Sequence, residues 1–235
     1  MANQAKSQIG LLIYPGMTQL DITAPHQVFA FMPDTQVHFL WKTLEPVKSD
    51  KGLKILPTTT LAECPTLDVI CVPGGPGTIA MMRDTEVLEF LQQQAKTAKY
   101  VTSVCTGSLI LAAAGLLLRY RAGCHWAFLD QLAMLGVEVS KERVVIDRNR
   151  ITGGGVTAGL DFGLIVASKL CGEETALTIQ LLLQYEPQPP FNAGSPEKAG
   201  FALVETVKKL GEQLIDASWE ATKETVARRG VATST

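Results

Sequence analysis

The stretch VTSVCTGSL at residues 101–109 decides the fold, because a run of β-forming residues ends at a cysteine and a helical stretch follows directly. Residues 101–104 predict a buried strand, and TGSLILAAAGLL at 106–117 predicts a helix. This strand–turn–helix order is typical of a nucleophile elbow, with cysteine in the position of serine. We therefore expect Cys105 to lie at the end of a central strand of an α/β fold.

The neighbouring segments predict the rest of the sheet. The stretches IGLLIYP at 9–15 and LDVICVPGG at 67–75 are apolar throughout, as in strands that are buried on both faces. They alternate with the helical patterns DITAPHQVFAFM, for which Asp21 or Thr23 is the expected N-cap, and DTEVLEFLQQQAKTA, which Asp84 caps. The stretch VEVSKERVVIDRNRIT predicts two more strands around charged turns. The pattern favours a parallel sheet sandwiched between helices.

The chain divides after the sheet domain, which we assign to residues 1–186. Residues 187–235 hold the linker PQPPFNAGSP and one long amphipathic helix, roughly 200–229, which we assign to the same domain. This helix either packs on its own domain or contacts a second subunit. Its long apolar stripe favours the contact with a second subunit.

The composition of the chain excludes several classes of function. The chain has 235 residues, 46% of them hydrophobic, and a net charge of −2, which suits one large domain and gives no basic surface for nucleic acid. No stretch is long and apolar enough for a signal peptide or a membrane span. Five cysteines without CxxC spacing fit neither a disulfide scaffold nor a metal site. We expect a cytoplasmic protein with no metal.

Cys105 is the candidate nucleophile, whereas Cys64, Cys71 and Cys171 are expected to be structural. At the start of a helix, free backbone N–H groups and the helix dipole favour a thiolate, so we predict a lowered pKa for Cys105. Gly107 and Ser108 are expected to keep the first turn small and to leave room for a substrate.

The proton-handling partner is expected to be Asp21. It follows the first strand, so it should face the same sheet edge as Cys105, where burial would raise the pKa of its carboxyl. Of the histidines, His26 and His38 are expected to be structural. His125, in GCHWAF, is the alternative partner.

Two glycine-rich turns, GPGTIA at 75–80 and GGGVTA at 153–158, fit a dinucleotide-binding pattern. Neither is followed about twenty residues later by an acidic residue that ends a second strand, as that pattern requires. We therefore expect no cofactor. The bare backbone at Gly74 and Gly75 is instead expected to present N–H groups to a charged intermediate.

Together the elbow, the PGG turn and the early acid resemble the ThiJ/PfpI superfamily, whose fold is flavodoxin-like, and within it the isocyanide hydratases. The stretches LDITAPHQVF, LDVICVPGG and TAGLDF are shared with the ligand-binding halves of AraC-type regulators. The segments YVTSVCTGSLILAAAGLL, HWAF and QYEPQPPFNAGSP also carry the resemblance, and the PPFNAGSP part of the tail narrows the match. The resemblance covers residues from about 9 to 196.

The resemblance implies that Cys105 is the nucleophile, that Asp21 is its acid partner, and that Thr106 and Gly75 line the substrate pocket. It also implies a homodimer and a small-molecule isocyanide as substrate. One departure is Cys124, where the family has threonine before the HW pair. This residue would bring a second thiol near the strand end.

The expected reaction adds water to an isocyanide, R–N≡C, through a cysteine thioimidate, and gives a formamide. Three alternatives stay open: a redox sensor or stress protein that uses oxidation of Cys105, another hydrolase or aldehyde-detoxifying enzyme of the superfamily, and an AraC-type ligand-binding domain. Only about fifty residues follow Tyr185, which is short for an added helix-turn-helix region.

Overall fold

The computed structural model describes residues 7–230 and is organised around a seven-stranded sheet. From edge to edge its strands are β10 (Val144–Asp147), β11 (Arg150–Gly153), β7 (Tyr100–Val104), β6 (Val69–Val72), β1 (Ser7–Leu12), β2 (Thr35–Trp41) and β5 (Thr59–Thr60). All neighbours are parallel except β10 and β11. The predicted α/β fold with a mostly parallel sheet is confirmed.

The segment after residue 136 forms three strands, not the two predicted. Its first part is β9 (Glu138–Val139), which pairs with β8 (Arg121–Ala122) in a separate small sheet. The register pairs Asp147 with Arg150, so only two residues connect β10 to β11, and Arg148 takes a φ of 53°. A two-residue connection joins only antiparallel strands, which explains the antiparallel edge.

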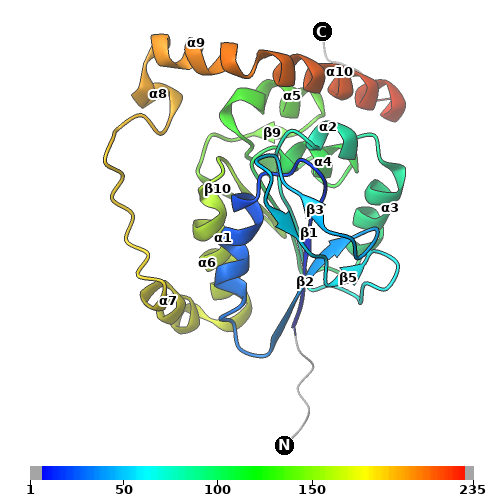
Figure 1. Ribbon diagram of the computed structural model, residues 1–235, viewed down its shortest axis with the longest axis vertical. Coiled ribbons are helices and arrows are strands. Elements are labelled where there is room, and N and C mark those ends of the chain that lie inside the picture. Colours follow the sequence, from blue (N-terminus) through cyan, green and yellow to red (C-terminus); the bar gives the residue numbers. More distant parts are fainter. Residues whose placement is uncertain (1–6, 231–235) are drawn as a thin grey trace, which may run out of the picture.

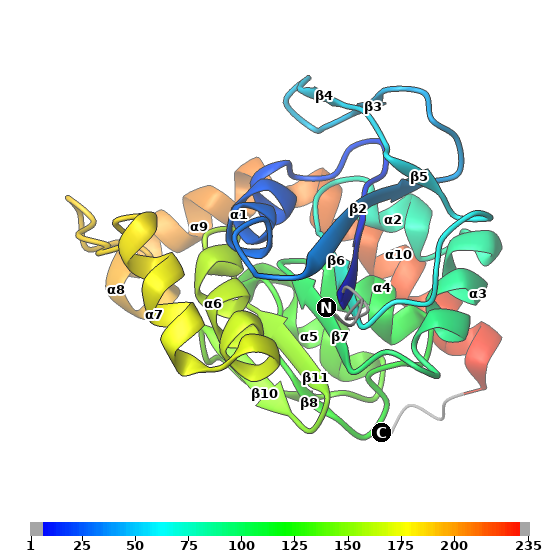
Figure 2. The ribbon, with the colours of Figure 1, turned by 90° about the horizontal axis from the view of Figure 1, so that it is seen from below.

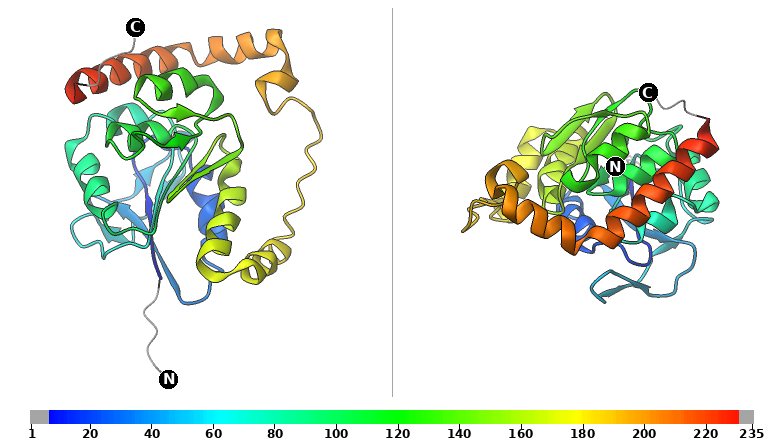
Figure 3. Two further views of the ribbon diagram at one scale, coloured as in Figure 1. Left: turned by 180° about the vertical axis from the view of Figure 1, so that it is seen from behind. Right: turned by 90° about the horizontal axis from the view of Figure 1, so that it is seen from above.

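Helices cover both faces of the sheet (Figure 1). One layer holds α1 (Leu20–Phe29) and α6 (Ala158–Cys171), and the other holds α3 (Thr85–Gln94), α4 (Gly107–Ala113) and α5 (Leu129–Met134), as the view from behind also shows (Figure 3). The strands are buried between these layers because both of their faces carry aliphatic side chains.

The N-cap prediction holds for α3 and is wrong for α1. Asp84 Oδ1 accepts the backbone N–H of Val87 at 3.2 Å and caps α3. Helix α1 instead begins after Gln19 without a side-chain cap, and Asp21 lies inside its first turn. The Asp21 carboxyl points to a partner outside the helix, so it is free from the capping role.

Two small elements lie at the carboxyl ends of the strands. Helix α2 (Thr78–Met81) follows the turn after β6. The hairpin of β3 (Val47–Lys48) and β4 (Lys54–Ile55) projects from the body of the molecule (Figure 2). The backbone N–H of Asp50 donates to Met17 O at 2.9 Å, which ties the hairpin to the loop after β1.

The C-terminal region forms several helices where one was predicted over 200–229. Helix α7 (Glu173–Leu182) leads through an extended segment to α8 (Pro196–Ala199), α9 (Phe201–Leu210) and α10 (Glu212–Arg229). Gly211 separates α9 from α10, and the two run end to end across the molecule (Figures 1 and 3). Within residues 7–230, no helix combines the length and the apolar composition needed to cross a bilayer.

Helices α9 and α10 are buried to different extents. Helix α10 packs on the domain through its buried residues, and Ser218 donates to Gln131 Oε1 at 2.6 Å. Every residue of α9 is exposed or half-buried. Helix α10 packs on its own domain, as the first alternative predicts. The apolar stripe of α9 is not covered by the domain and is available to a second subunit, as the other alternative requires.

Candidate active site

The carboxyl ends of β1, β6 and β7 meet at one edge of the sheet. The chain passes from β1 to β2 on one side and returns to β6 on the other, so the strand order reverses between β1 and β6. Ligands of open α/β sheets bind at such a reversal. Asp21 follows β1, Gly74 follows β6 and Cys105 follows β7, as predicted for residues that share this edge.

Cys105 has the strained backbone of a nucleophile elbow. Its φ is 57°, in the left-handed region that costs a non-glycine residue roughly 1–3 kcal/mol. Its N–H donates to Gly153 O at 3.1 Å, which fixes the turn between β7 and α4. The predicted strand–turn–helix arrangement around Cys105 is thereby confirmed.

The small residues after Cys105 serve packing, whereas room for a substrate at this turn stays a prediction. A Cβ on Gly107 would collide with the carbonyl oxygen of Val72, so α4 can approach β6 only with glycine there. The Ser108 hydroxyl is buried, lies 2.9 Å from Ser103 Oγ and donates to Gly123 O. Both residues hold the elbow against its neighbours.

Asp21 is buried and divides its two carboxyl oxygens between two functions. Oδ2 accepts the backbone N–H of Gly74 at 2.8 Å. Oδ1 is buried and has no conventional hydrogen-bond partner among residues 7–230. Burial raises the pKa of Asp21 to about 7, and the charge of Asp50 adds to the rise. The Gly74 bond and an interaction with the Cys105 thiol oppose it.

The prediction of a lowered pKa for Cys105 is wrong. Burial raises the pKa of this thiol well above its usual range, and the charges of Asp21 and Cys124 raise it further. The N–H and the hydroxyl of Thr106 lower the pKa only in part. The side chain is 6% exposed and every residue of α4 is buried, so desolvation outweighs the helix dipole.

Burial raises the pKa of both groups, and the thiol of Cys105 is the weaker acid of the two. Transfer of the thiol proton from the sulfur to the Asp21 carboxyl would give a thiolate beside a carboxylic acid, with no change in the charge of the site. Such a pair can deliver a nucleophile and a proton together.

The backbone donors of the Gly74–Gly75 turn are already engaged. Gly74 donates to Asp21, and the N–H of Gly75 donates to Thr106 Oγ1 at 2.9 Å. The expectation that both groups are offered directly to an intermediate is not met in this arrangement. Gly74 must lack a side chain, because a Cβ there would lie 2.5 Å from Thr106 Oγ1 and 3.0 Å from the Cβ of Cys105.

This elbow and its acid partner lie inside a segment that matches a known family. Residues 7–169 match the family model described as the DJ-1/PfpI family. The chain belongs to the DJ-1/PfpI family. The resemblance drawn from the Cys105 elbow, the PGG turn and Asp21 is confirmed at the level of the family.

Individual members of the DJ-1/PfpI family narrow the comparison. The chain is 51% identical over 221 residues to the isonitrile hydratase of Pseudomonas putida, across 94% of this chain and 97% of that protein. A solved ThiJ/PfpI family protein from Pseudomonas syringae superposes with a TM-score of 0.89 at 44% identity, across 94% of this chain and 93% of that one. The HTH-type transcriptional regulator GbdR of Pseudomonas aeruginosa is 32% identical across 78% of this chain and 52% of the regulator.

In this DJ-1/PfpI protein the ring of each histidine has a hydrogen-bond or ring partner. His125 Nδ1 accepts the N–H of Ala127 at 3.3 Å, and burial lowers the pKa of its ring. The ring centroid lies 5.5 Å from that of Trp126. His38 bonds to Thr59 at 2.9 Å, and His26 packs against Phe39. Cys124 is a buried thiol whose charge couples to that of Cys105, consistent with the second thiol expected near the strand end.

The sequence analysis did not identify two buried hydroxyl groups of the site, those of Tyr14 and Thr78. Tyr14 follows β1 and donates to Pro73 O at 2.8 Å. Thr78 opens α2, and its Oγ1 lies 2.9 Å from Thr106 Oγ1. The available signal was weak: a tyrosine before the Pro15–Gly16 turn and a threonine after Gly77, neither of which has a diagnostic spacing to Cys105.

Proposed function

We propose that this protein is an isocyanide hydratase, which adds water to R–N≡C and releases the formamide R–NH–CHO. The observation that carries the proposal is the free, buried Oδ1 of Asp21 beside the strained Cys105. This arrangement occurs in a chain that is 51% identical to an isonitrile hydratase over nearly the full length of both proteins. We assign catalytic roles to Cys105 and Asp21, and substrate-binding roles to Thr106 and Gly75.

The first half of the reaction forms a covalent adduct. Asp21 takes the proton of the Cys105 thiol, and the sulfur attacks the terminal carbon of the isocyanide, which forms the C–S bond. Asp21 then gives the same proton to that carbon. The product is the thioimidate R–N=CH–S–Cys105, and Asp21 is a carboxylate again. A carboxyl with a pKa of about 7 suits both the uptake and the release of this proton.

The second half hydrolyses the adduct. Asp21 takes a proton from water as the hydroxyl adds to the thioimidate carbon, and returns that proton to the substrate nitrogen. The tetrahedral adduct R–NH–CH(OH)–S–Cys105 then loses its hydroxyl proton to Asp21. The C–S bond breaks, and the formamide leaves. The N–H and hydroxyl of Thr106, which lower the pKa of Cys105, stabilise the departing thiolate.

The alternative functions have less support. Peptide hydrolysis by cysteine uses a histidine to activate the thiol and protonate the leaving amine, whereas His125 caps the short helix η1 (Trp126–Phe128). Similarity to GbdR covers about half of that regulator. A redox-sensor role needs a readily formed thiolate, and burial raises the pKa of Cys105.

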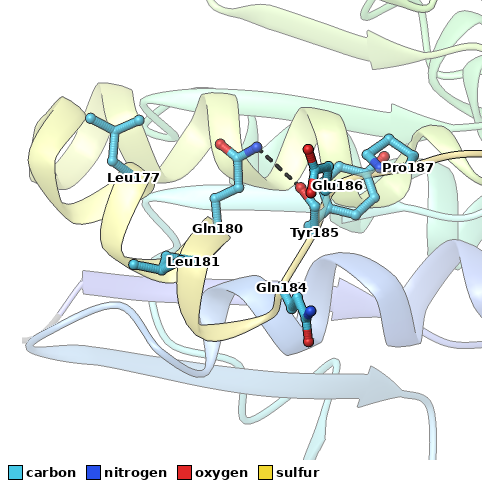
Figure 4. Close-up of a pocket in the computed structure, with 7 residues that line it drawn as sticks. All are labelled: Leu177, Gln180, Leu181, Gln184, Tyr185, Glu186 and Pro187. Atoms are coloured by element: carbon cyan, nitrogen blue, oxygen red, sulfur yellow. Dashed lines mark hydrogen bonds between the residues drawn. The ribbon is translucent and has the colours of Figure 1, made fainter.

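We also propose that the protein is a homodimer whose interface is built on α7, the linker and α9. Leu181, Phe191, Phe201 and Leu210 are each more than 80% exposed, which is costly for a monomer. Of these residues, Leu181 lines a hollow of about 390 Å³ that is formed by α7 and the segment after it (Figure 4). Because α9 extends beyond the body of the domain (Figure 1), a second copy related by a two-fold axis would cover it.

The five cysteines are all free thiols, which supports the assignment of the activity to the reducing cytoplasm. The partners that we propose are a small isocyanide as substrate and a second copy of the chain.

A direct assay tests the function. The purified protein is incubated with an aryl isocyanide, and the N-formyl amine is quantified by chromatography and mass spectrometry. We expect turnover many-fold above the buffer rate, and a mass increase on Cys105 equal to that of the isocyanide when the reaction is quenched early. Formamide production equal to that of a Cys105→Ala variant would refute the proposal.

A further inference from the structure

We propose that Thr78 is a positioning residue that directs the hydroxyl proton of Thr106 at the sulfur of Cys105. The inference rests on the proposed nucleophilic role of Cys105, and it goes further by assigning a function to a buried residue of α2. It follows from the hydrogen bonds that three buried hydroxyls, those of Tyr14, Thr78 and Thr106, can make.

The chain of hydroxyls starts at Tyr14. Burial raises the pKa of this tyrosine well above its usual range, so it keeps its proton. That proton goes to the carbonyl oxygen of Pro73 at 2.8 Å, since a carbonyl can only accept. Toward Thr78, at 3.3 Å, the Tyr14 oxygen is therefore only an acceptor.

Thr78 has one proton and two neighbouring oxygens. Thr106 Oγ1 lies 2.9 Å away, within the range of a good O–H···O bond, whereas the Tyr14 oxygen at 3.3 Å lies beyond it. The geometry thus gives the Thr78 proton to Thr106. The alternative direction, from Thr106 to Thr78, would force Thr78 to donate across the longer contact.

Thr106 then has both lone pairs filled. Its oxygen accepts the N–H of Gly75 at 2.9 Å as well as the hydroxyl of Thr78. The single Thr106 proton remains for the thiol of Cys105, whose pKa the Thr106 hydroxyl lowers. The two residues pack against the same glycine, since a Cβ on Gly74 would be 2.5 Å from Thr106 Oγ1 and 3.0 Å from the Cys105 Cβ. Two donors into one hydroxyl also make it a stronger donor itself.

The burial of this chain argues for a chemical role. Thr78 is 3% exposed, and valine has the same shape without the cost of burying a hydroxyl. The hydroxyl becomes useful when the sulfur carries charge, as in the attack on the substrate and in the release of the thiolate. Thr78 touches neither the sulfur nor the proposed substrate directly, so its effect must pass through Thr106.

The test measures the reactivity of Cys105 without any isocyanide. Alkylation by iodoacetamide is followed at the Cys105 peptide by mass spectrometry across pH 6 to 10, which reports the fraction of thiolate. We expect Thr78→Val to slow alkylation at pH 8 by about three- to tenfold and to shift the profile to higher pH by about half to one unit. Thr78→Ser, which keeps the hydroxyl, should react within twofold of wild type.

A matched control separates this role from a structural one. Tyr14→Phe removes a hydroxyl of similar burial that leaves both donors to Thr106 in place. It should lower the melting temperature while the alkylation profile stays within twofold of wild type. Thr78→Ala serves as a second variant should Thr78→Val fail to fold.

A double-mutant cycle shows whether Thr78 acts through Thr106. In a Thr106→Val background, Thr78→Val should have no further effect on the alkylation profile. Equal profiles for wild type and the Thr78 variants, or effects of Thr78→Val and Thr106→Val that multiply, would overturn the inference. A protein that shows the expected cycle but makes no formamide would refute the proposed hydratase activity and leave this inference intact.

Discussion

The backbone N–H of Gly74 donates to Asp21 Oδ2 at 2.8 Å and joins the end of β6 to the first turn of α1. This bond occupies Oδ2, whereas the buried Oδ1 has no hydrogen-bond partner among residues 7–230. The same glycine lies against Thr106 and Cys105 where a side chain would not fit. One residue of a turn thus orients the Asp21 carboxyl and lets Thr106 and Cys105 approach closely.

Replacement of the nucleophile should abolish turnover. Cys105→Ala or Cys105→Ser should lower formamide production from an aryl isocyanide by far more than tenfold, since covalent catalysis supplies many kcal/mol. Circular dichroism should show an intact fold. The matched control is Cys171→Ser, a half-buried thiol at the end of α6, which should leave turnover almost unchanged. A Cys105→Ala variant that retained a tenth of the activity would contradict the covalent mechanism.

Asp21→Asn should reduce turnover by at least about 100-fold. The amide can still accept the N–H of Gly74, so the geometry is kept while proton transfer is lost. Initial binding of the isocyanide should persist. Asp50→Asn removes another carboxyl near the site and should stay within a few-fold of wild type. Turnover of Asp21→Asn at the wild-type rate would exclude the acid role, and His125 would become the next candidate.

The same substitution should change how stability depends on pH. The pKa of Asp21 is about 7 in the folded protein against 3.8 for an exposed carboxyl, so the folded state binds more protons between these values. The free energy of unfolding should therefore fall as the pH rises from about 4 to 7.

Asp21→Asn removes this dependence. Measured by urea unfolding, its stability relative to wild type should rise between pH 4 and 7 by up to about 4 kcal/mol, at ~1.4 kcal/mol for each pH unit of the window. A difference between the two proteins that stays constant with pH would show that Asp21 ionises in the folded protein as it does in water.

Gly74→Ala should disable the site. The added Cβ would meet the backbone nitrogen and hydroxyl of Thr106, and relief of this contact displaces the residue next to Cys105. We expect a loss of at least about 100-fold in kcat, because small misplacements of catalytic groups have effects of this size. The control is Gly194→Ala in the linker, where a Cβ meets open space. Near wild-type kinetics for Gly74→Ala would mean that the turn adapts freely.

The proposed interface predicts a dimer of about twice 25.3 kDa in light scattering at micromolar concentration. Phe201→Glu with Leu210→Glu should give monomers, since both side chains are more than 80% exposed on α9 and would be covered only by a partner. Leu56→Glu, on an exposed loop elsewhere, should leave the dimer unchanged. Point substitutions are preferable to truncation after Pro196, which would also remove α10 and its buried contacts.

A monomeric wild-type protein would contradict the dimer. If the Phe201→Glu, Leu210→Glu variant remains a dimer, the interface lies on another face of the sheet domain.

The sequence by itself determined the elements and their chemistry where the signal is local. The apolar runs at 9–15, 67–75 and 101–104 predict buried parallel strands because both faces of each strand must be covered. The abrupt change at Cys105 from β-formers to a small-residue helix start predicts the elbow, and the position of Asp21 just past the first strand predicts a shared edge. Each of these inferences depends on residues that are neighbours in the chain.

Only the tertiary structure decided the properties that distant residues create together. The pKa of Cys105 is raised because packing removes water from the first turn of α4, and desolvation does not appear in a sequence pattern. The Asp21 carboxyl does not cap α1 and instead bonds to Gly74, 53 residues away. Thr78 gains its contact with Thr106 only when α2 and α4 meet over the end of β6. Burial and long-range hydrogen bonds are properties of the packed chain, so they become visible only once the chain is folded.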